Sequence, residues 1–218
     1  MLKERAHIFN MMNRDSTYGA TSGLILRRIR GKGRGWAFTP SDFADAGDPR
    51  SVGMVLSRLV KHEKIRRVQR GVYEVTHEHP LIGTVGAGAD AVMAAIARRD
   101  ALKLLPSKAA AANVLHLSTQ VPAVTTYGVT GRSRTISVGG KSSVKLKRRS
   151  PKSVALAGRF SGWLAEALRS FGRGKVSAVD LQKLKRQVPR EARKQLMDDL
   201  RYVPAWMRPI FKEVAKND

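Results

Sequence analysis

Apolar residues first recur at helical spacing after Thr21, at Leu24, Ile25 and Ile29. They would share one side of a helix. The glycine-rich run at residues 31–35 would end it, because glycine is favoured just past a helix C-terminus. Residues 1–18 show no comparable pattern and predict no defined element.

Two signals for helix starts follow. Thr39-Pro40 and Asp48-Pro49 each place a capping residue before a proline, the residue favoured at the first helical position. After a short strand at residues 36–38, they predict a short second helix from Pro40 and a third helix from Pro49 to about His62. The arrangement is a helix, a tight turn and a helix.

The third predicted helix has two unlike faces. Its apolar stripe, at 100° per residue, contains Val52, Val55, Leu56, Leu59 and Val60. The opposite side gathers Arg50, Met54, Ser57 and Lys61, with Ser51 and Arg58 flanking them. One face therefore belongs to a core, and the other is free to contact a partner.

A β-hairpin is expected directly after this helix. Residues 65–68 and 72–75 have strand composition, and the turn between them contains Gly71, where a positive φ is expected. Ile65 and Val68 are three positions apart, so the alternation does not decide which of Arg66 and Arg67 points outward. The whole pattern predicts a winged helix-turn-helix.

Charge narrows the class of partner. The 218 residues include 41 Lys and Arg against 17 Asp and Glu, a formal net charge of +24, and both halves are basic. Such a chain favours a polyanion, above all nucleic acid. Hydrophobic residues make up 42%, enough for a folded core. The lack of cysteine excludes disulfide scaffolds, thiol catalysis and cysteine-ligated zinc modules.

The free face of the third helix and the cations near it form a candidate DNA-binding surface. Short polar and forked basic side chains reach base edges, and flanking cations hold phosphates. On the helix the predicted contacts are Arg50, Ser51, Met54, Ser57, Arg58 and Lys61. On the hairpin and around the first helix they are Arg66, Arg67, Arg70, Arg27, Arg28, Lys32 and Arg34. A merely solvated charged surface and a winged helix that contacts only protein remain open alternatives.

The second half mixes helices with strands after a glycine-rich link at residues 77–89. Helices are expected at residues 90–100, 108–116, 158–171, 177–187, 189–200 and 206–214, and strands at 102–105, 123–127, 135–138 and 143–146. The predicted fold class is α+β, with a winged helix-turn-helix domain at residues 1–78 and a mixed α/β domain at 79–218.

A basic run without acidic residues lies in this second domain: Arg132, Arg134, Lys141, Lys145, Lys147, Arg148 and Arg149. A glycine-punctuated hairpin of this kind can hold phosphates of DNA or RNA. It can equally serve as a docking face for an acidic protein, and the sequence does not separate these uses.

Catalytic and metal-binding constellations are not apparent. Asp198 and Asp199 are adjacent, so on a helix they point about 100° apart and do not share a site. His77 and His79 have no third ligand at fitting spacing. We therefore expect no enzyme, no cofactor and no metal. No apolar stretch reaches the roughly 20 residues of a membrane span, and no secretory signal begins the chain, so we expect a cytoplasmic protein.

Several motifs resemble the AbiEi-type antitoxins of type IV toxin–antitoxin systems. In the first half they are residues 38–43 (FTPSDF), 57–60 (SRLV), 65–68 (IRRV) and 70–73 (RGVY). In the second half, residues 111–123 (AANVLHLSTQVPA) and 131–134 (GRSR) look like the hallmark of the family's C-terminal antitoxin domain.

The resemblance implies a bacterial transcriptional autorepressor that binds inverted repeats in its own promoter and antagonises a nucleotidyltransferase-like toxin. The antitoxin surface, or a second nucleic-acid surface, would contain Asn113, Ser118, Thr119, Gln120, Arg132, Arg134, Lys145, Lys147, Arg148 and Arg149. The chain departs from the family pattern in two places: His116 stands in place of a glycine, and residues 127–131 lack an aspartate.

Other interpretations stay open at this point. Asn113 and Gln120 would bond the backbone if residues 113–123 form only a packed corner between a helix and a strand. The protein as a whole could be a basic interaction or RNA-binding protein that neutralises a partner directly. A monomer in solution and a dimer on DNA both fit the sequence.

Overall fold

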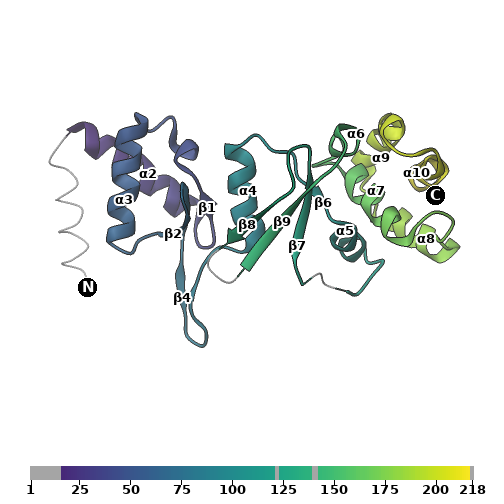
Figure 1. Ribbon diagram of the computed structural model, residues 1–218, viewed down its shortest axis with the longest axis horizontal. Coiled ribbons are helices and arrows are strands. Elements are labelled where there is room, and N and C mark those ends of the chain that lie inside the picture. Colours follow the sequence, from purple (N-terminus) through teal and green to yellow (C-terminus); the bar gives the residue numbers. More distant parts are fainter. Residues whose placement is uncertain (1–15, 121–122, 139–141, 217–218) are drawn as a thin grey trace. The chain divides into compact units, whose positions relative to one another are not determined.

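The computed structural model describes residues 16–120, 123–138 and 142–216 (Figure 1). The chain forms two compact units. Of the described residues, the first holds those up to Ala101 together with Ser137, Val138 and Ser142, and the second holds those from Leu102 to Ile136 and from Ser143 onward. Helices and strands occur in both units, which confirms the expected mixture of α and β structure. No helix among the described residues is long and apolar enough to cross a membrane.

The described elements of the first unit follow the predicted order, except that β4 and β5 were not predicted. They are α2 (Ser16–Lys32), β1 (Ala37–Phe38), the 3₁₀ helix η1 (Pro40–Phe43), α3 (Pro49–Lys61), β2 (Arg66–Gln69), β3 (Val72–Glu74), β4 (His77–His79), β5 (Gly83–Val85) and α4 (Ala89–Arg99). The first helix starts earlier than its apolar pattern indicated, and the second is a single 3₁₀ turn. Thr39 and Asp42 form a capping box at the start of that turn.

The core of the first unit lies between α2, α3 and the strands. The buried face of α3 is the predicted one, with Val52, Val55, Leu56 and Leu59 each at most 4% exposed. Phe38 is fully buried, and its ring centroid lies 5.4 Å from that of Phe43 and 6.0 Å from that of Tyr73. The aromatic centre fixes α3 against the sheet, so its opposite face is held outward.

The strand order β1-β3-β2 makes an antiparallel three-stranded sheet. Arg66 pairs with Glu74 and Arg67 with Tyr73, and the register then shifts before Gln69. This irregularity explains the imperfect spacing of Ile65 and Val68, because an extra residue in one strand reverses the side-chain alternation. The turn contains Gly71 at a φ of +71°, as expected.

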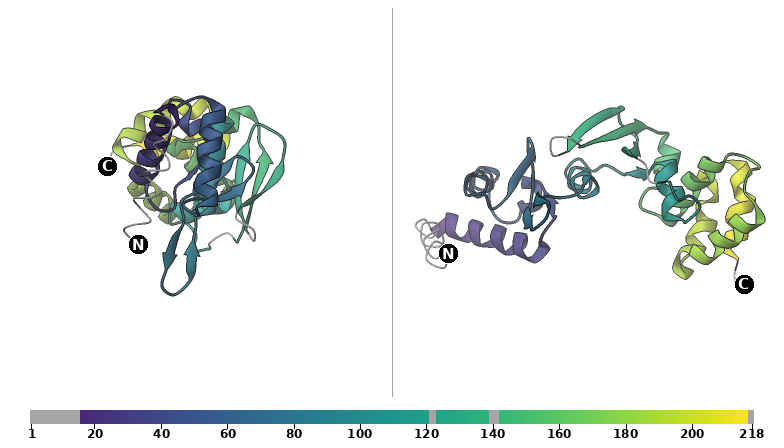
Figure 2. Two further views of the ribbon diagram at one scale, coloured as in Figure 1. Left: turned by 90° about the vertical axis from the view of Figure 1, so that its left-hand side faces the viewer. Right: turned by 90° about the horizontal axis from the view of Figure 1, so that it is seen from below.

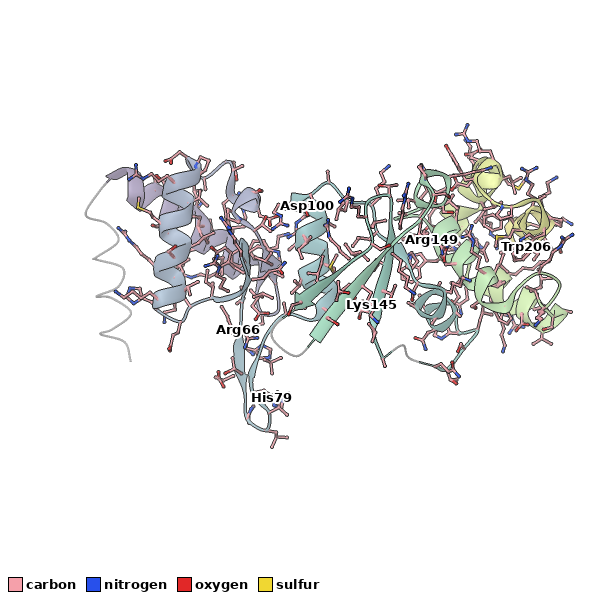
Figure 3. The ribbon with its side chains drawn as sticks, in the orientation of Figure 1. Arg66, His79, Asp100, Lys145, Arg149 and Trp206 are labelled. Atoms are coloured by element: carbon pink, nitrogen blue, oxygen red, sulfur yellow. The ribbon has the colours of Figure 1, made fainter. Side chains whose placement is uncertain are left out.

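Residues 77–89 are not the flexible link that the glycines suggested. His77–His79 (β4) and Gly83–Val85 (β5) pair as an antiparallel hairpin that extends away from the rest of the first unit (Figure 2). His79 lies on this hairpin, towards its tip (Figure 3). The tip exposes 88% of Leu81 and 71% of Ile82.

The first unit also extends beyond the expected boundary at residue 78. Helix α4 belongs to it, because Val92, Met93 and Ile96 are buried and Arg98 reaches back to η1 and β1. The Arg98 Nε donates a 2.8 Å hydrogen bond to Asp42, and its Nη2 donates to the carbonyl of Ala37. These contacts bring a helix predicted for the second domain onto the first.

The second unit combines a sheet with a helical bundle. Its described elements are β6 (Leu105–Pro106), α5 (Lys108–Val114), β7 (Thr125–Val129), β8 (Arg134–Val138), β9 (Ser142–Arg148), α6 (Pro151–Val154), α7 (Phe160–Phe171), α8 (Ala178–Gln187), α9 (Arg190–Asp198), the 3₁₀ helices η2 (Asp199–Tyr202) and η3 (Ala205–Met207), and α10 (Arg208–Ala215). Ser137, Val138 and Ser142, at the ends of β8 and β9, are the exception, because they belong to the first unit. The strand order is β6-β7-β9-β8, and β7 and β9 run parallel. Residue Lys141 of the predicted basic run lies outside the described residues.

Helices α5 and α7 to α10 enclose the core of the second unit (Figure 2). Leu105, Leu164, Leu168, Leu196 and Phe211 are each at most 1% exposed. The helices predicted from residues 158, 177, 189 and 206 are present with shifts of a few residues at their ends. The strand expected at 102–105 is reduced to the two residues of β6.

Candidate nucleic-acid interface

The start of α3 is fixed by its capping aspartate. The Asp48 Oδ1 accepts 3.0 Å hydrogen bonds from the backbone N–H groups of Arg50 and Ser51, and Oδ2 accepts one from the Ser51 hydroxyl. These bonds, led by that from the Ser51 hydroxyl, lower the pKa of Asp48. The prediction that the Ser51 side chain lies on the DNA-facing side is therefore wrong, because this side chain is buried and stabilises the start of α3.

The remaining predicted residues of α3 lie on its outer face. Arg50, Ser57, Arg58 and Lys61 are exposed, and Met54 is half-buried. Arg50 and Lys61 form no ion pair within the described part of the chain. The helix thus presents two arginines, a lysine and a hydroxyl on one side, with a thioether between them.

The β2–β3 hairpin uses one of its arginines internally. The Arg66 Nε donates a 2.5 Å hydrogen bond to the buried carboxylate of Glu74, which also accepts a 2.6 Å bond from the backbone N–H of Ala87. A Cβ at Gly86 would lie 2.7 Å from the Glu74 Cδ, so a glycine lets the chain pass this ion pair. Arg66 is held in place by this contact.

Arg67 and Arg70 are the hairpin's outward cations. Both are exposed, and neither forms an ion pair with a residue that the structure describes. The choice between Arg66 and Arg67, which the sequence left open, is decided by Glu74, because the buried carboxylate needs a cationic partner. Arg67 is the one left for a partner molecule.

Arg28 also has a structural role. Its two Nη atoms donate hydrogen bonds of 2.8 and 2.6 Å to the carboxylate of Asp45, and Nη1 donates to the carbonyl of Asp42. The hydrogen bond from Arg28 lowers the pKa of Asp45 to about 2. The guanidinium also lies 5.6 Å from the ring centroid of Phe43. The prediction that Arg28 contacts a phosphate is therefore corrected, because its guanidinium joins α2 to η1 and to Asp45 just after it.

Other cations of α2 and the following turn stay available. Arg27, Lys32 and Arg34 are exposed and form no ion pair among the residues with a described structure. Arg30 has the same character and was missed by the sequence interpretation. Its spacing of three residues from Arg27 places both on neighbouring positions of one helix face, a signal that was available.

Residues 111–120 of the AANVLHLSTQVPA motif form a packed corner in the second unit. The Asn113 Nδ2 donates a 3.2 Å hydrogen bond to the carbonyl of Ser118, whose hydroxyl accepts one of 3.1 Å from the backbone N–H of Gln120. The side chains of Thr119 and Gln120 are exposed. The structural interpretation is correct for Asn113, whereas Gln120 bonds through its backbone rather than its side chain.

His116 occupies a backbone position that favours glycine, the residue expected there in AbiEi-type antitoxins. Its φ is +52°, in the left-handed region where glycine has no steric penalty. The two peptide N–H groups that follow it, those of Leu117 and Ser118, close the turn after α5 by bonding to the carbonyl of Ala112. A glycine would suit this position better than the histidine present.

The basic strands separate into an inner and an outer face. On β9, Val144 and Leu146 are buried while Lys145 and Lys147 are exposed, the period-two alternation of a half-buried strand. Arg132, Arg134 and Arg148 are also exposed. Arg149 is half-buried and donates a 2.5 Å hydrogen bond to Glu166 on α7. This second set of cations belongs to the second unit, apart from the set on α2, α3 and the β2–β3 hairpin.

Comparisons with known proteins identify the family of the chain. No curated protein matches the chain. Among the residues that the structure describes, no group of three or more His, Asp or Glu side chains is arranged to hold a metal ion. Residues 24–196, which span most of both units, match a family described as being of unknown function, DUF6088, and the chain belongs to this family.

Proposed function

We propose that the protein is a DNA-binding transcriptional repressor whose first unit acts as a winged helix-turn-helix. The carrying observation is the outer face of α3, where Arg50, Ser57 and Lys61 are exposed on a helix whose other side is buried. In this proposal α3 is the recognition helix, η1 is the preceding helix of the motif, and the β2–β3 hairpin is the wing.

The chemistry of this surface favours duplex DNA over a generic anion. The major groove admits an α-helix, and arginine is the side chain best suited to the edge of guanine. Arg50 and Arg58 are assigned to base edges, with Ser57 between them. Arg67 and Arg70 on the wing, and Arg27 on α2, are assigned to phosphates, since they are exposed cations on elements beside α3.

The antitoxin role extends this proposal and is supported by the resemblance of residues 111–134 to AbiEi-type antitoxins. The protein would repress its own promoter at an inverted repeat and antagonise a nucleotidyltransferase-like toxin. Two half-sites about one helical turn apart would take two copies of the chain. The exposed side chains of Thr119 and Gln120 are the part of the motif that remains open to a partner.

The test is binding of the full chain to the DNA upstream of its own gene, measured by fluorescence anisotropy at about 0.15 M salt with a scrambled duplex as competitor. A repressor should prefer its operator by roughly a thousandfold or more. Equal affinity for the scrambled duplex would contradict a promoter-specific role and leave a general nucleic-acid binder.

A second experiment separates the two roles. Arg50→Ala with Arg58→Ala should abolish repression of a promoter reporter, because both assigned base contacts are lost. The same double variant should still rescue cells from the toxin if the antitoxin role belongs to the second unit. Loss of both activities in a protein that remains folded would contradict that division.

A further inference from the structure

A cavity in the second unit has the composition of an anion site. Its volume is about 290 Å³, and its walls come from the start of α5, strands β7 and β9, and helix α7. The cations among its lining residues are Lys108, Lys147 and Arg149, and the carboxylate among them is Glu166. Cationic side chains from the start of α5 and from the end of β9 therefore line one cavity.

The carboxylate does not neutralise these cations. Glu166 is 1% exposed and accepts hydrogen bonds from both Arg149 and Arg169, so one buried negative charge is shared by two guanidinium groups. Lys108 and Lys147 form no ion pair with any residue in the described part of the chain. The cavity wall thus has three cations and one carboxylate, and the excess positive charge favours a bound anion.

Contacts within the protein fix the position of the Arg149 side chain before any ligand binds. Its Nη2 is held 2.5 Å from Glu166, and its aliphatic stem passes close to β7 at Gly128, where a Cβ would lie 2.6 Å from the Arg149 Cγ. Because a guanidinium has five N–H donors, the bond to Glu166 leaves others for a ligand. A fixed arginine loses little side-chain entropy on binding.

We propose that this cavity binds the terminal phosphate of a small molecule, with Arg149, Lys147 and Lys108 as its contacts. A terminal phosphate carries nearly two negative charges near neutral pH, twice that of a phosphodiester in a nucleic-acid backbone, and so matches several converging cations better. The volume lies at the lower end of ordinary ligand sites, which suits a phosphate with a small organic group.

The test uses inorganic pyrophosphate as the probe and isothermal titration calorimetry of the full chain at about 0.15 M NaCl. Lys108→Gln with Lys147→Gln removes two of the proposed contacts. Lys183→Gln with Lys212→Gln is the matched control, because both of these lysines are exposed in the same unit and neither lines the cavity. Thermal melting of both double variants checks that each remains folded before its binding is compared.

One pyrophosphate should bind per chain, and the cavity variant should bind it at least about tenfold more weakly than the wild type and the control. Absence of binding, or equal weakening by both double variants, would overturn the proposal. The proposal would also be overturned if a short oligothymidylate without terminal phosphates displaced pyrophosphate, and if the cavity variant no longer bound that oligothymidylate. The cavity would then be a nucleic-acid contact. Operator binding by α3 is measured separately, so either proposal can fail alone.

Discussion

Substitutions in the β2–β3 hairpin, the wing of the proposed repressor, give the sharpest test of how the first unit would bind DNA. Arg28 and Arg66 are internally paired, and Arg50 and Arg58 are assigned to base edges. Six exposed cations of the candidate DNA-binding surface then remain for phosphates: Arg27, Lys32, Arg34, Lys61, Arg67 and Arg70. Each phosphate that is neutralised contributes about −0.9 to the slope of log affinity against log salt. Six contacts therefore give a slope of about −5.4.

Replacing Arg67 and Arg70 by Gln should remove two of these contacts. The slope should fall to about −3.6, so that raising salt from 50 to 200 mM weakens binding about 150-fold instead of about 2,000-fold. Sequence preference should change little, because wing cations are assigned to phosphates and not to bases. The assay is fluorescence anisotropy of the operator at four or five salt concentrations.

The matched control is Arg173→Gln with Arg186→Gln, two exposed arginines of the second unit. It removes the same net charge from a different place. An unchanged slope in the wing variant, or an equal change in the control, would refute the assignment of Arg67 and Arg70 to the DNA backbone.

Three further predictions concern single features of the fold. His116→Gly should raise the free energy of unfolding by about 1 kcal/mol in urea titrations, because φ is +52° at this residue; a loss of stability would refute the strain argument. Asp45→Asn should reduce the loss of melting temperature between pH 4 and pH 2. The pKa of Asp45 is lowered from 3.8 to about 2, so its stabilising contribution is present above pH 4 and is lost as pH falls towards 2. Thermal melting at several pH values measures this difference. Leu81→Ser with Ile82→Ser should leave operator affinity unchanged within about twofold, because residues 71–97 contain no Lys or Arg; a large loss in anisotropy would make the β4–β5 hairpin part of the DNA site.

Local signals were sufficient for much of the first unit. The Asp48-Pro49 start and the apolar stripe predicted α3 almost to the residue, because capping and periodicity are both contained in a short stretch of sequence. The β4–β5 hairpin was missed for the converse reason. Its strands have three residues each, include Gly83, and lack the apolar alternation that marks a half-buried strand.

The identity of the free cations could not be predicted in the same way. Arg28 and Arg66 read as ordinary surface arginines, and only the folded chain brings Asp45 and Glu74 to them. Ser51 is a second case, since its position beside the free face of α3 did not reveal that Asp48 holds its hydroxyl. Composition thus indicated a polyanion partner, whereas the tertiary contacts determine which cationic side chains are available to bind it.

The central claim is that the outer face of α3 lies in a DNA groove, and photo-crosslinking tests it most directly. A photo-reactive amino acid would replace Ser57 on that face, and in a second protein it would replace Val179, which is 61% exposed on α8 in the second unit. Crosslinking from position 57 to bases within the operator, with little from position 179, is the predicted result. Crosslinks from position 179 alone, with position 57 silent on DNA that is demonstrably bound, would contradict the account.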